Sequence, residues 1–250
     1  MGPPHVYLRT MEGLAIPAQT EIHVWHSSLA ISVAERETFY ALLDAEERER
    51  AGRFRFDASR DAFIASHGWL RTLLGRYLNA DPRSLEFTFG NRGKPALQGT
   101  PLRFNLSHSG AMAACAVARN QEIGIDIELI RPMSDLESVV RRFFHPEECR
   151  KLLALREEDR ETAFFHCWTR KEAYIKALGD GLSADLGRFE VTLAPGEPAA
   201  VVRIDGRPAA RDWSVFGLDV GPGYAGAVAI RGTDWVVRMR GSLCELQIAP

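Results

Sequence analysis

Two segments made almost entirely of small apolar residues occupy matching places in the two halves of the chain. Residues 113–118 read Ala-Ala-Cys-Ala-Val-Ala, and residues 224–230 read Tyr-Ala-Gly-Ala-Val-Ala-Ile. Each is preceded, in the same order, by a helical segment, two strand-like segments and a turn that contains glycine. Such self-similarity indicates a duplicated structural unit. We therefore predict an α+β fold of two similar halves, residues 1–122 and 123–250.

The bulk composition excludes several classes of protein. The net charge of −2 does not suit a nucleic-acid-binding protein, which is usually clearly basic. No apolar run approaches the roughly 20 residues that cross a bilayer, and the N-terminus lacks the layout of a signal peptide. The four cysteines, Cys115, Cys149, Cys167 and Cys244, form no C-x-x-C pair. This spacing fits no zinc site and favours a reducing, cytoplasmic compartment.

Hydrophobic periodicity places a long helix in each half. Apolar side chains recur at steps of three and four through residues 59–78, which is the helical period. His67 lies on that apolar stripe, so we interpret it as a semi-buried structural histidine. The second long helix runs from about residue 159 to 178. Residues 33–50 also look helical, and their charged run 45–50 is typical of a solvated helix face.

Three carboxylates are candidates for a metal site. Asp126 and Glu128 are two residues apart in a predicted strand, so their side chains point to one face, and Mg²⁺ prefers oxygen ligands of this kind. An exposed strand face with two solvated acids fits the same spacing. Glu172 and Lys176, four residues apart on a helix, fit an ordinary helix ion pair. On spacing alone the ion pair is the better interpretation, but a third carboxylate beside the other two would complete a metal site, and the adjacent ammonium would add affinity for phosphate.

The segment Ser107-His108-Ser109-Gly110 follows a strand over 102–106 and is predicted to be a polar turn. Hydroxyls and backbone N–H groups in such a turn can hold a phosphate, although a plain hairpin loop would look the same. A nucleophilic Ser–His pair is disfavoured, because neighbours in sequence rarely reach the required geometry and no acidic partner is evident.

Lysine is rare in this chain and is concentrated near these candidates. Only Lys94, Lys151, Lys171 and Lys176 occur among 31 basic residues, and three of the four lie in two short motifs. Because lysine is a compact point charge and arginine a planar fork, this bias indicates positions that need an ammonium.

Taken in order, five motifs resemble the Sfp-type 4′-phosphopantetheinyl transferases. The motifs are Gly93-Lys94-Pro95, Phe104-Asn105-Leu106-Ser107-His108-Ser109, Gly124-Ile125-Asp126-Ile127-Glu128, Arg142-Phe143-Phe144-His145-Pro146-Glu147-Glu148 and Trp168-Thr169-Arg170-Lys171-Glu172-Ala173-Tyr174-Ile175-Lys176. Their order and gaps match the family over residues 46–193, and the duplicated layout extends the match to most of the chain.

The resemblance implies a pseudo-dimeric α+β fold with coenzyme A in the cleft between the halves. It implies Mg²⁺-dependent transfer of the phosphopantetheine arm to a serine of an acyl or peptidyl carrier protein, with release of adenosine 3′,5′-bisphosphate. One chain then supplies both halves of the cleft, so we expect a monomer. Fatty-acid, polyketide and nonribosomal-peptide carriers all remain open. A second hypothesis is a non-catalytic module that binds coenzyme A or a nucleotide, and a third is a metal-dependent phosphodiesterase.

The resemblance also assigns roles to residues of this chain. Asp126, Glu128 and Glu172 match the metal ligands, with Glu172 also the general base. Lys176 matches the lysine that contacts the pyrophosphate and assists the leaving oxygen. The remaining matches to coenzyme A contacts are Lys94 and Pro95 on the adenine side, Ser107 and His108 on the phosphates, and the looser basic set Arg48, Arg50, Arg53 and Arg60.

Three further expectations concern the surface. The segment between Glu128 and Glu148, including Ile130, Met133 and Leu136, is the candidate surface for the carrier, with Phe143 and Phe144 expected in the core. Lys171 flanks Glu172 and is expected on the surface.

Overall fold

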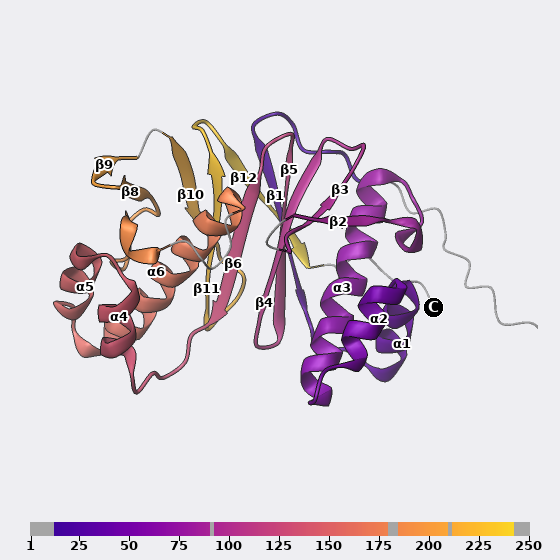
Figure 1. Ribbon diagram of the computed structural model, residues 1–250, viewed down its shortest axis with the longest axis horizontal. Helices are drawn as coiled ribbons and strands as arrows, with labels where there is room; N and C mark the ends of the chain where they lie inside the picture. Colours follow the sequence, from indigo (N-terminus) through magenta and orange to yellow (C-terminus); the bar gives the residue numbers. More distant parts are fainter. Residues whose placement is uncertain (1–12, 91–92, 180–184, 210–211, 243–250) are drawn as a thin grey trace, which may run out of the picture.

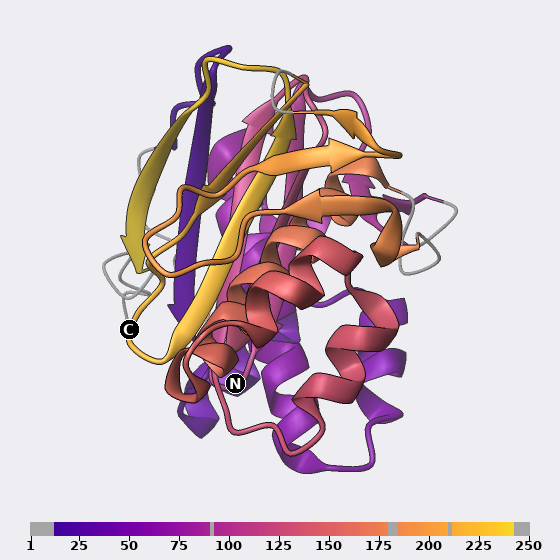
Figure 2. The ribbon, with the colours of Figure 1, turned by 90° about the vertical axis from the view of Figure 1, so that its left-hand side faces the viewer.

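The computed structural model describes residues 13–90, 93–179, 185–209 and 212–242. Strands fill the centre of the molecule, and a layer of helices covers each side (Figure 1). The helices between residues 136 and 178 lie on one side and those between residues 33 and 78 on the other; the view at right angles shows the helices of residues 136–178 in front of the strands (Figure 2). In the described part of the chain, no helix is both long and apolar enough to cross a membrane.

The same order of helices and strands occurs in each half of the chain. The first unit consists of β1 (Glu21–Ser28), α1 (Val33–Leu42), α2 (Ala45–Gly52), α3 (Asp57–Leu78), η1 (Pro82–Ser84), β2 (Phe87–Phe89), β3 (Pro95–Leu97), β4 (Leu102–Ser109) and β5 (Met112–Arg119). The second consists of β6 (Ile123–Leu129), α4 (Leu136–Phe143), α5 (Pro146–Leu153), α6 (Glu157–Leu178), η3 (Leu186–Arg188), β7 (Phe189–Val191), β8 (Val201–Ile204), β9 (Arg207–Pro208), β10 (Trp213–Gly217) and β11 (Tyr224–Arg231). The α+β class and the repeated layout predicted from the sequence are confirmed.

Strand pairing follows the same repeat. Strand β1 is antiparallel to β5, and β6 is antiparallel to β11; β4–β5 and β10–β11 are the matching hairpins. The last strand, β12 (Val236–Ser242), pairs in parallel with β1. The sheet orders are therefore β12-β1-β5-β4 and β10-β11-β6, with the small sheets β2-β3 and β7-β8-β9 at the two sides.

The small-residue strands are buried on both faces. Ala113, Cys115 and Val117 of β5 pack in the core beneath α3, whereas Ala114, Ala116 and Ala118 pack in a second core shared with β6 and β11. Alternating side chains point to opposite faces of a strand. Small side chains on both faces let a helical layer and a second sheet approach the same strand, which explains why this composition occurs in both halves.

The long helices have the predicted extents. Helices α3 and α6 have 22 residues each, and each ends at a residue in the left-handed region, Asn79 with φ 50° and Gly179 with φ 78°. The helix predicted over 33–50 is divided in two, because Asp44 caps a new helix and forms a capping box with Glu47.

A buried ion pair connects Lys171 of α6 with Glu148 of α5, and both side chains are fully buried. The Lys171 ammonium lies 2.8 Å from the carboxylate and donates to the carbonyls of Leu186 (2.8 Å) and Phe189 (2.7 Å). The expectation that Lys171 lies on the surface was wrong. Burial raises the pKa of Glu148, and the Lys171 ammonium opposes that rise.

The first half holds a matching pair. Arg71 lies seven residues before the end of α3, as Lys171 does in α6, and its Nε lies 2.6 Å from Glu47 of α2. Arg71 also donates to two carbonyls after its helix, and its guanidinium lies over Phe87 as Lys171 lies over Phe189. Glu47 is buried, so the prediction of a solvated face for 45–50 was wrong there. His67 donates to Glu47 over 2.9 Å and is half-buried, as predicted.

Gly124 of β6 sets the distance between β6 and α6. A Cβ atom at this position would lie 2.0 Å from the carbonyl oxygen of Ala173 and 2.4 Å from the amide nitrogen of Ala177. Since both neighbours are helix backbone, they cannot move aside separately. The helix therefore packs directly on the strand that carries Asp126.

We expect Gly124→Ala to force α6 away from β6 and to lower the free energy of unfolding by about 3 kcal/mol or more, as overpacking in a rigid core does. Urea unfolding followed by circular dichroism measures the loss. Gly217→Ala is the matched control, because a Cβ at this strand glycine meets nothing within 4 Å. Equal stabilities of the two variants would contradict the role given to Gly124.

Candidate active site

Three carboxylates converge where α6 crosses β6. Asp126 and Glu128 come from one face of β6, and Glu172 comes from α6; Asp126 and Glu172 are 4% and 7% exposed. The pKa of Glu172 is raised to about 7, mainly by burial; the charges of Asp126 and Glu128 add to the rise, and the Lys176 ammonium opposes it. The pKa values of Asp126 and Glu128 are also raised, mainly by burial. The structure thus brings together the three acids that the sequence singled out.

Lys176 forms its ion pair with Asp126 rather than with Glu172. Its ammonium lies 2.7 Å from Asp126 Oδ1 and 3.2 Å from both Ser107 Oγ and the carbonyl of Ile125. The alternative of an ordinary i, i+4 helix pair with Glu172 is therefore wrong. One ammonium compensates only part of the charge of three carboxylates.

Two buried oxygens of these three carboxylates have no hydrogen-bond partner. They are Asp126 Oδ2 and Glu172 Oε1. Leaving such oxygens unpaired is costly, and a hard cation with oxygen ligands would satisfy both. Within the described ranges, no group of three or more His, Cys, Asp or Glu side chains is placed so that it could hold a metal ion by itself. The donor set fits a cation that also takes ligands from a bound substrate or water.

The predicted turn at Ser107–Gly110 is wrong in its extent, because β4 continues to Ser109 and the chain turns at Gly110, with φ 55°. Strand alternation therefore puts Ser107 and Ser109 on one face and His108 on the other. Ser107 donates to Asp126 Oδ1 over 2.9 Å and Ser109 donates to Glu128 Oε2 over 2.6 Å. Both serines thus contact the carboxylate group, and Ser107 binds Asp126 and Lys176 instead of its neighbour His108.

His108 is exposed to solvent and lies among positively charged side chains. Partial desolvation lowers its pKa, and the positive charges of His67, Lys176 and Arg50 lower it further. These groups come from α2, α3, β4 and α6. Among the four arginines of the looser basic set, Arg50 is the one whose charge lowers the pKa of His108. Arg53 instead pairs with Glu49, Arg60 pairs with Asp57 and Asp61, and Arg48 donates to the carbonyls of Tyr40 and Ala41.

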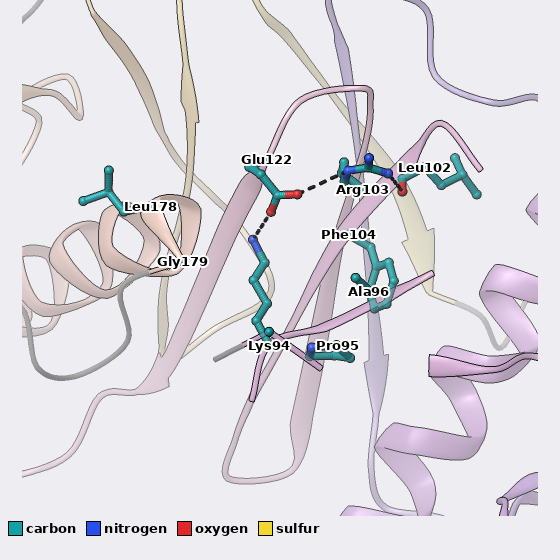
Figure 3. A pocket seen from close by; sticks show the side chains of 10 residues that line it. Lys94, Pro95, Ala96, Leu102, Arg103, Phe104, Glu122, Leu178 and Gly179 are labelled. Carbon is teal, nitrogen blue, oxygen red and sulfur yellow. Dashed lines mark hydrogen bonds and ion pairs between the residues drawn. The ribbon is translucent and has the colours of Figure 1, made fainter. Parts of the chain in front are cut away.

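A pocket of about 240 Å³ opens between β3, β4 and the end of α6 (Figure 3). It is lined by Gly90, Lys94, Pro95, Ala96, Leu102, Arg103, Phe104, Glu122, Leu178 and Gly179. The Lys94 ammonium donates to Glu122 (2.7 Å) and to the carbonyls of Ile123 (2.9 Å) and Lys176 (3.0 Å). Because the carbonyl of Lys176 belongs to α6, Lys94 connects the pocket to the helix that carries Glu172.

Sequence reasoning missed Glu122 and Arg103. Glu122 accepts a hydrogen bond from Lys94 and forms an ion pair with Arg103 at 3.2 Å, so it holds both of these pocket side chains in place (Figure 3). Nothing local marks Glu122, which lies in an ordinary polar turn between two strands. Only the approach of β3 and β4 to that turn gives it a role.

Part of the segment expected to form the carrier surface is buried. Leu136 lies in the core of the second half, whereas Ile130 and Met133 are half-buried and pack against it. Phe144 is buried as predicted, but Phe143 is 37% exposed, so its expected place in the core was wrong.

Comparison with known proteins identifies the family of this chain. Residues 122–229 match the 4′-phosphopantetheinyl transferase superfamily, and residues 30–120 match the family described as 4′-phosphopantetheinyl transferase, N-terminal. The 4′-phosphopantetheinyl transferase HetI of Nostoc sp. is 42% identical over 86% of this chain and 90% of its own length. The 4′-phosphopantetheinyl transferase Sfp of Bacillus subtilis is 32% identical over 82% of this chain and 89% of its own length.

The chain therefore belongs to the 4′-phosphopantetheinyl transferases, a class of enzymes. Within that class it is of the Sfp type, since both of its halves match and the relatives extend over nearly the whole chain.

Proposed function

We propose that this enzyme transfers the 4′-phosphopantetheine arm of coenzyme A to a serine of an acyl or peptidyl carrier protein, with Mg²⁺ as cofactor and adenosine 3′,5′-bisphosphate as the second product. One observation supports it above the others. Asp126, Glu128 and Glu172 converge beside the Lys176 ammonium, and two of their buried oxygens have no partner. Acting as a monomer, one chain supplies every group in the site.

The donor set suits a magnesium ion held by Asp126, Glu128 and Glu172. When bound, Mg²⁺ neutralises charge on the diphosphate of coenzyme A and orients it. It would also satisfy Asp126 Oδ2 and Glu172 Oε1.

The protein's own residues then have distinct tasks. In the metal-free protein the pKa of Glu172 is raised to about 7, mainly by burial. We assign to this carboxylate the proton of the carrier serine, because a carboxylate within hydrogen-bond reach of the incoming hydroxyl can act as its base. The serine oxygen forms a bond to phosphorus while the bond from that phosphorus to the bridging oxygen breaks. Lys176 donates to the oxygen that leaves with adenosine 3′,5′-bisphosphate.

The cations around the site bind the remaining phosphates. Arg50 contributes positive charge beside His108, and Lys94 with Pro95 borders the pocket that we assign to the adenine side of coenzyme A. Arg53 and Arg60 point to carboxylates of their own helices, so they contribute to the field around the coenzyme more than to direct contacts. Half-buried Ile130 and Met133, with exposed Phe143, form the surface that we assign to the carrier.

The transfer is tested by incubating the protein with coenzyme A, Mg²⁺ and an apo carrier protein and weighing the carrier by mass spectrometry. We expect the carrier to gain one phosphopantetheine arm. Binding of coenzyme A without transfer to any of several carriers would instead support a non-catalytic module. Cleavage of coenzyme A without a carrier would support a phosphodiesterase.

Asp126→Asn should lower the transfer rate by roughly a hundredfold or more, as loss of one charge-stabilising group typically does. The amide keeps the size of the side chain but removes the charge that faces the cation and Lys176. The same mass assay measures the rate, with exposed Asp219→Asn as the control. Full activity in Asp126→Asn would remove the metal assignment.

A further inference from the structure

Strands β4 and β6 are the facing edges of the two main sheets (Figure 1). Side chains of β4 join the two strands where backbone pairs would normally occur. From Asn105 to Ser109, every second side chain of β4 accepts from a backbone N–H of β6. Asn105 accepts from Ile125 (2.8 Å), Ser107 from Ile127 (3.4 Å) and Ser109 from Leu129 (3.1 Å). On its other edge, β6 pairs with β11 over its whole length. At the β4–β6 edge, the joint between the two halves therefore consists of short polar side chains.

Ser107 and Ser109 make one repeated contact. Each hydroxyl accepts from the N–H of the residue that follows a carboxylate and donates to that carboxylate: Ser107 to Asp126, and Ser109 to Glu128. A hydroxyl has one donor and two acceptor sites, so it can do both. Each serine thereby fixes a carboxylate relative to its own strand.

Glu128 depends on this contact more than Asp126 does. Asp126 also pairs with Lys176 at 2.7 Å, whereas the other ion pair of Glu128 is with Arg131 at 3.9 Å, and that arginine side chain is 59% exposed. A glutamate side chain has several rotatable bonds and loses much rotamer entropy when it is ordered. The 2.6 Å contact from Ser109 is therefore the main restraint that aims Glu128 at Asp126 and Glu172.

We propose that Ser109 is a positioning residue, whose hydroxyl holds Glu128 in the orientation that binds the divalent cation. The proposal rests on the proposed function, because it assigns Glu128 to the cation. Ser109 itself touches neither substrate nor metal. Loss of groups that orient metal ligands typically weakens metal binding by about 10- to 100-fold.

The test compares Ser109→Ala, Ser109→Thr and Ser214→Ala. Thr keeps the hydroxyl and suits a strand. Ser214 is a matched control, since it is a half-buried strand serine whose hydroxyl donates to the carbonyl of Gly232 over 2.7 Å. Electron paramagnetic resonance measures Mn²⁺ binding to each protein in the presence of coenzyme A. The transfer assay separately gives the Mg²⁺ concentration at half-maximal rate and the rate at saturating Mg²⁺.

We expect Ser109→Ala to bind Mn²⁺ about tenfold more weakly and to need correspondingly more Mg²⁺, with most of its rate recovered at saturating Mg²⁺. Ser109→Thr and Ser214→Ala should behave like the native protein in both assays. Native Mn²⁺ affinity in Ser109→Ala would overturn the proposal, and so would an equal loss in Ser109→Thr. If the native protein transfers the arm without any divalent cation, the proposed metal site fails together with this proposal. If the native protein needs the cation but Ser109→Ala binds and uses it as the native protein does, this proposal alone fails.

Discussion

Glu172→Gln is expected to abolish transfer and, at the same time, to make the metal-free protein more stable at pH 8. The carboxylate is 7% exposed, and burial together with Asp126 and Glu128 raises its pKa from 4.5 to about 7. An acid whose pKa is raised by folding binds its proton more tightly in the folded state. Its ionisation therefore lowers the stability of the folded protein as pH rises from about 4.5 to about 7, and the full cost remains above that range.

The size of the effect follows from the shift. A pKa change of one unit corresponds to about 1.4 kcal/mol, so the ionised Glu172 side chain lowers the free energy of unfolding by up to about 3 kcal/mol at pH 8. The amide carries no charge and avoids that cost. Transfer should fall roughly a thousandfold, because the base and one cation ligand are lost together.

Urea unfolding of both proteins at pH 5 and pH 8, in the presence of a chelator, measures the stability difference. The gain of Glu172→Gln over the native protein should be small at pH 5 and largest at pH 8. Glu37→Gln, an exposed change on α1, should alter stability by less than about 0.5 kcal/mol at either pH. A destabilised Glu172→Gln at pH 8 would mean that the carboxylate is stabilised by the fold rather than held at a cost for function.

Lys171→Met is the change expected to cost the most stability outside the carboxylate group. It leaves Glu148 charged and fully buried, and it deprives the carbonyls of Leu186 and Phe189 of their donor. Removing one partner of a buried ion pair typically costs about 3–5 kcal/mol, a large part of the free energy of unfolding of many domains. We therefore expect a loss of about 3–5 kcal/mol, measured by urea unfolding.

Two comparisons make this prediction specific. Lys171→Met combined with Glu148→Gln should recover part of the loss, because no buried charge is then left unpaired. Arg141→Met, which removes an exposed i, i+4 pair with Glu137, should cost less than about 1 kcal/mol. If Lys171→Met cost no more than Arg141→Met, the buried pair would contribute nothing to folding, whether or not the double variant recovered.

Sequence periodicity predicted the parts of the fold that depend on local pattern. It predicted both long helices, the duplicated layout, and the shared face of Asp126 and Glu128, because helix and strand periods act over a few residues. Lys171 and Glu47 were misplaced for the opposite reason. Their burial depends on partners in other helices, and a charged residue in a helix looks the same whether it faces water or a buried carboxylate.

The site shows the same division. The sequence singled out Asp126, Glu172 and Lys176, but it could not decide which carboxylate Lys176 would pair with, since that depends on how α6 crosses β6 at Gly124. The sequence predicted that the strand of β4 ends before Ser107, because Ser-His-Ser-Gly has the composition of a turn. Pairing with Met112 and Ala113 of β5 keeps Ser109 and His108 in the strand.

The central claim is that Asp126, Glu128 and Glu172 hold one divalent cation against the diphosphate of coenzyme A. A crystal of the protein grown with coenzyme A and Mn²⁺, with diffraction data collected at the manganese edge, tests it most directly. We predict one anomalous peak that contacts all three carboxylates, including the now unpartnered Asp126 Oδ2 and Glu172 Oε1, and the diphosphate. Coenzyme A bound with the manganese peak elsewhere, or with the three carboxylates turned away from it, would contradict the account.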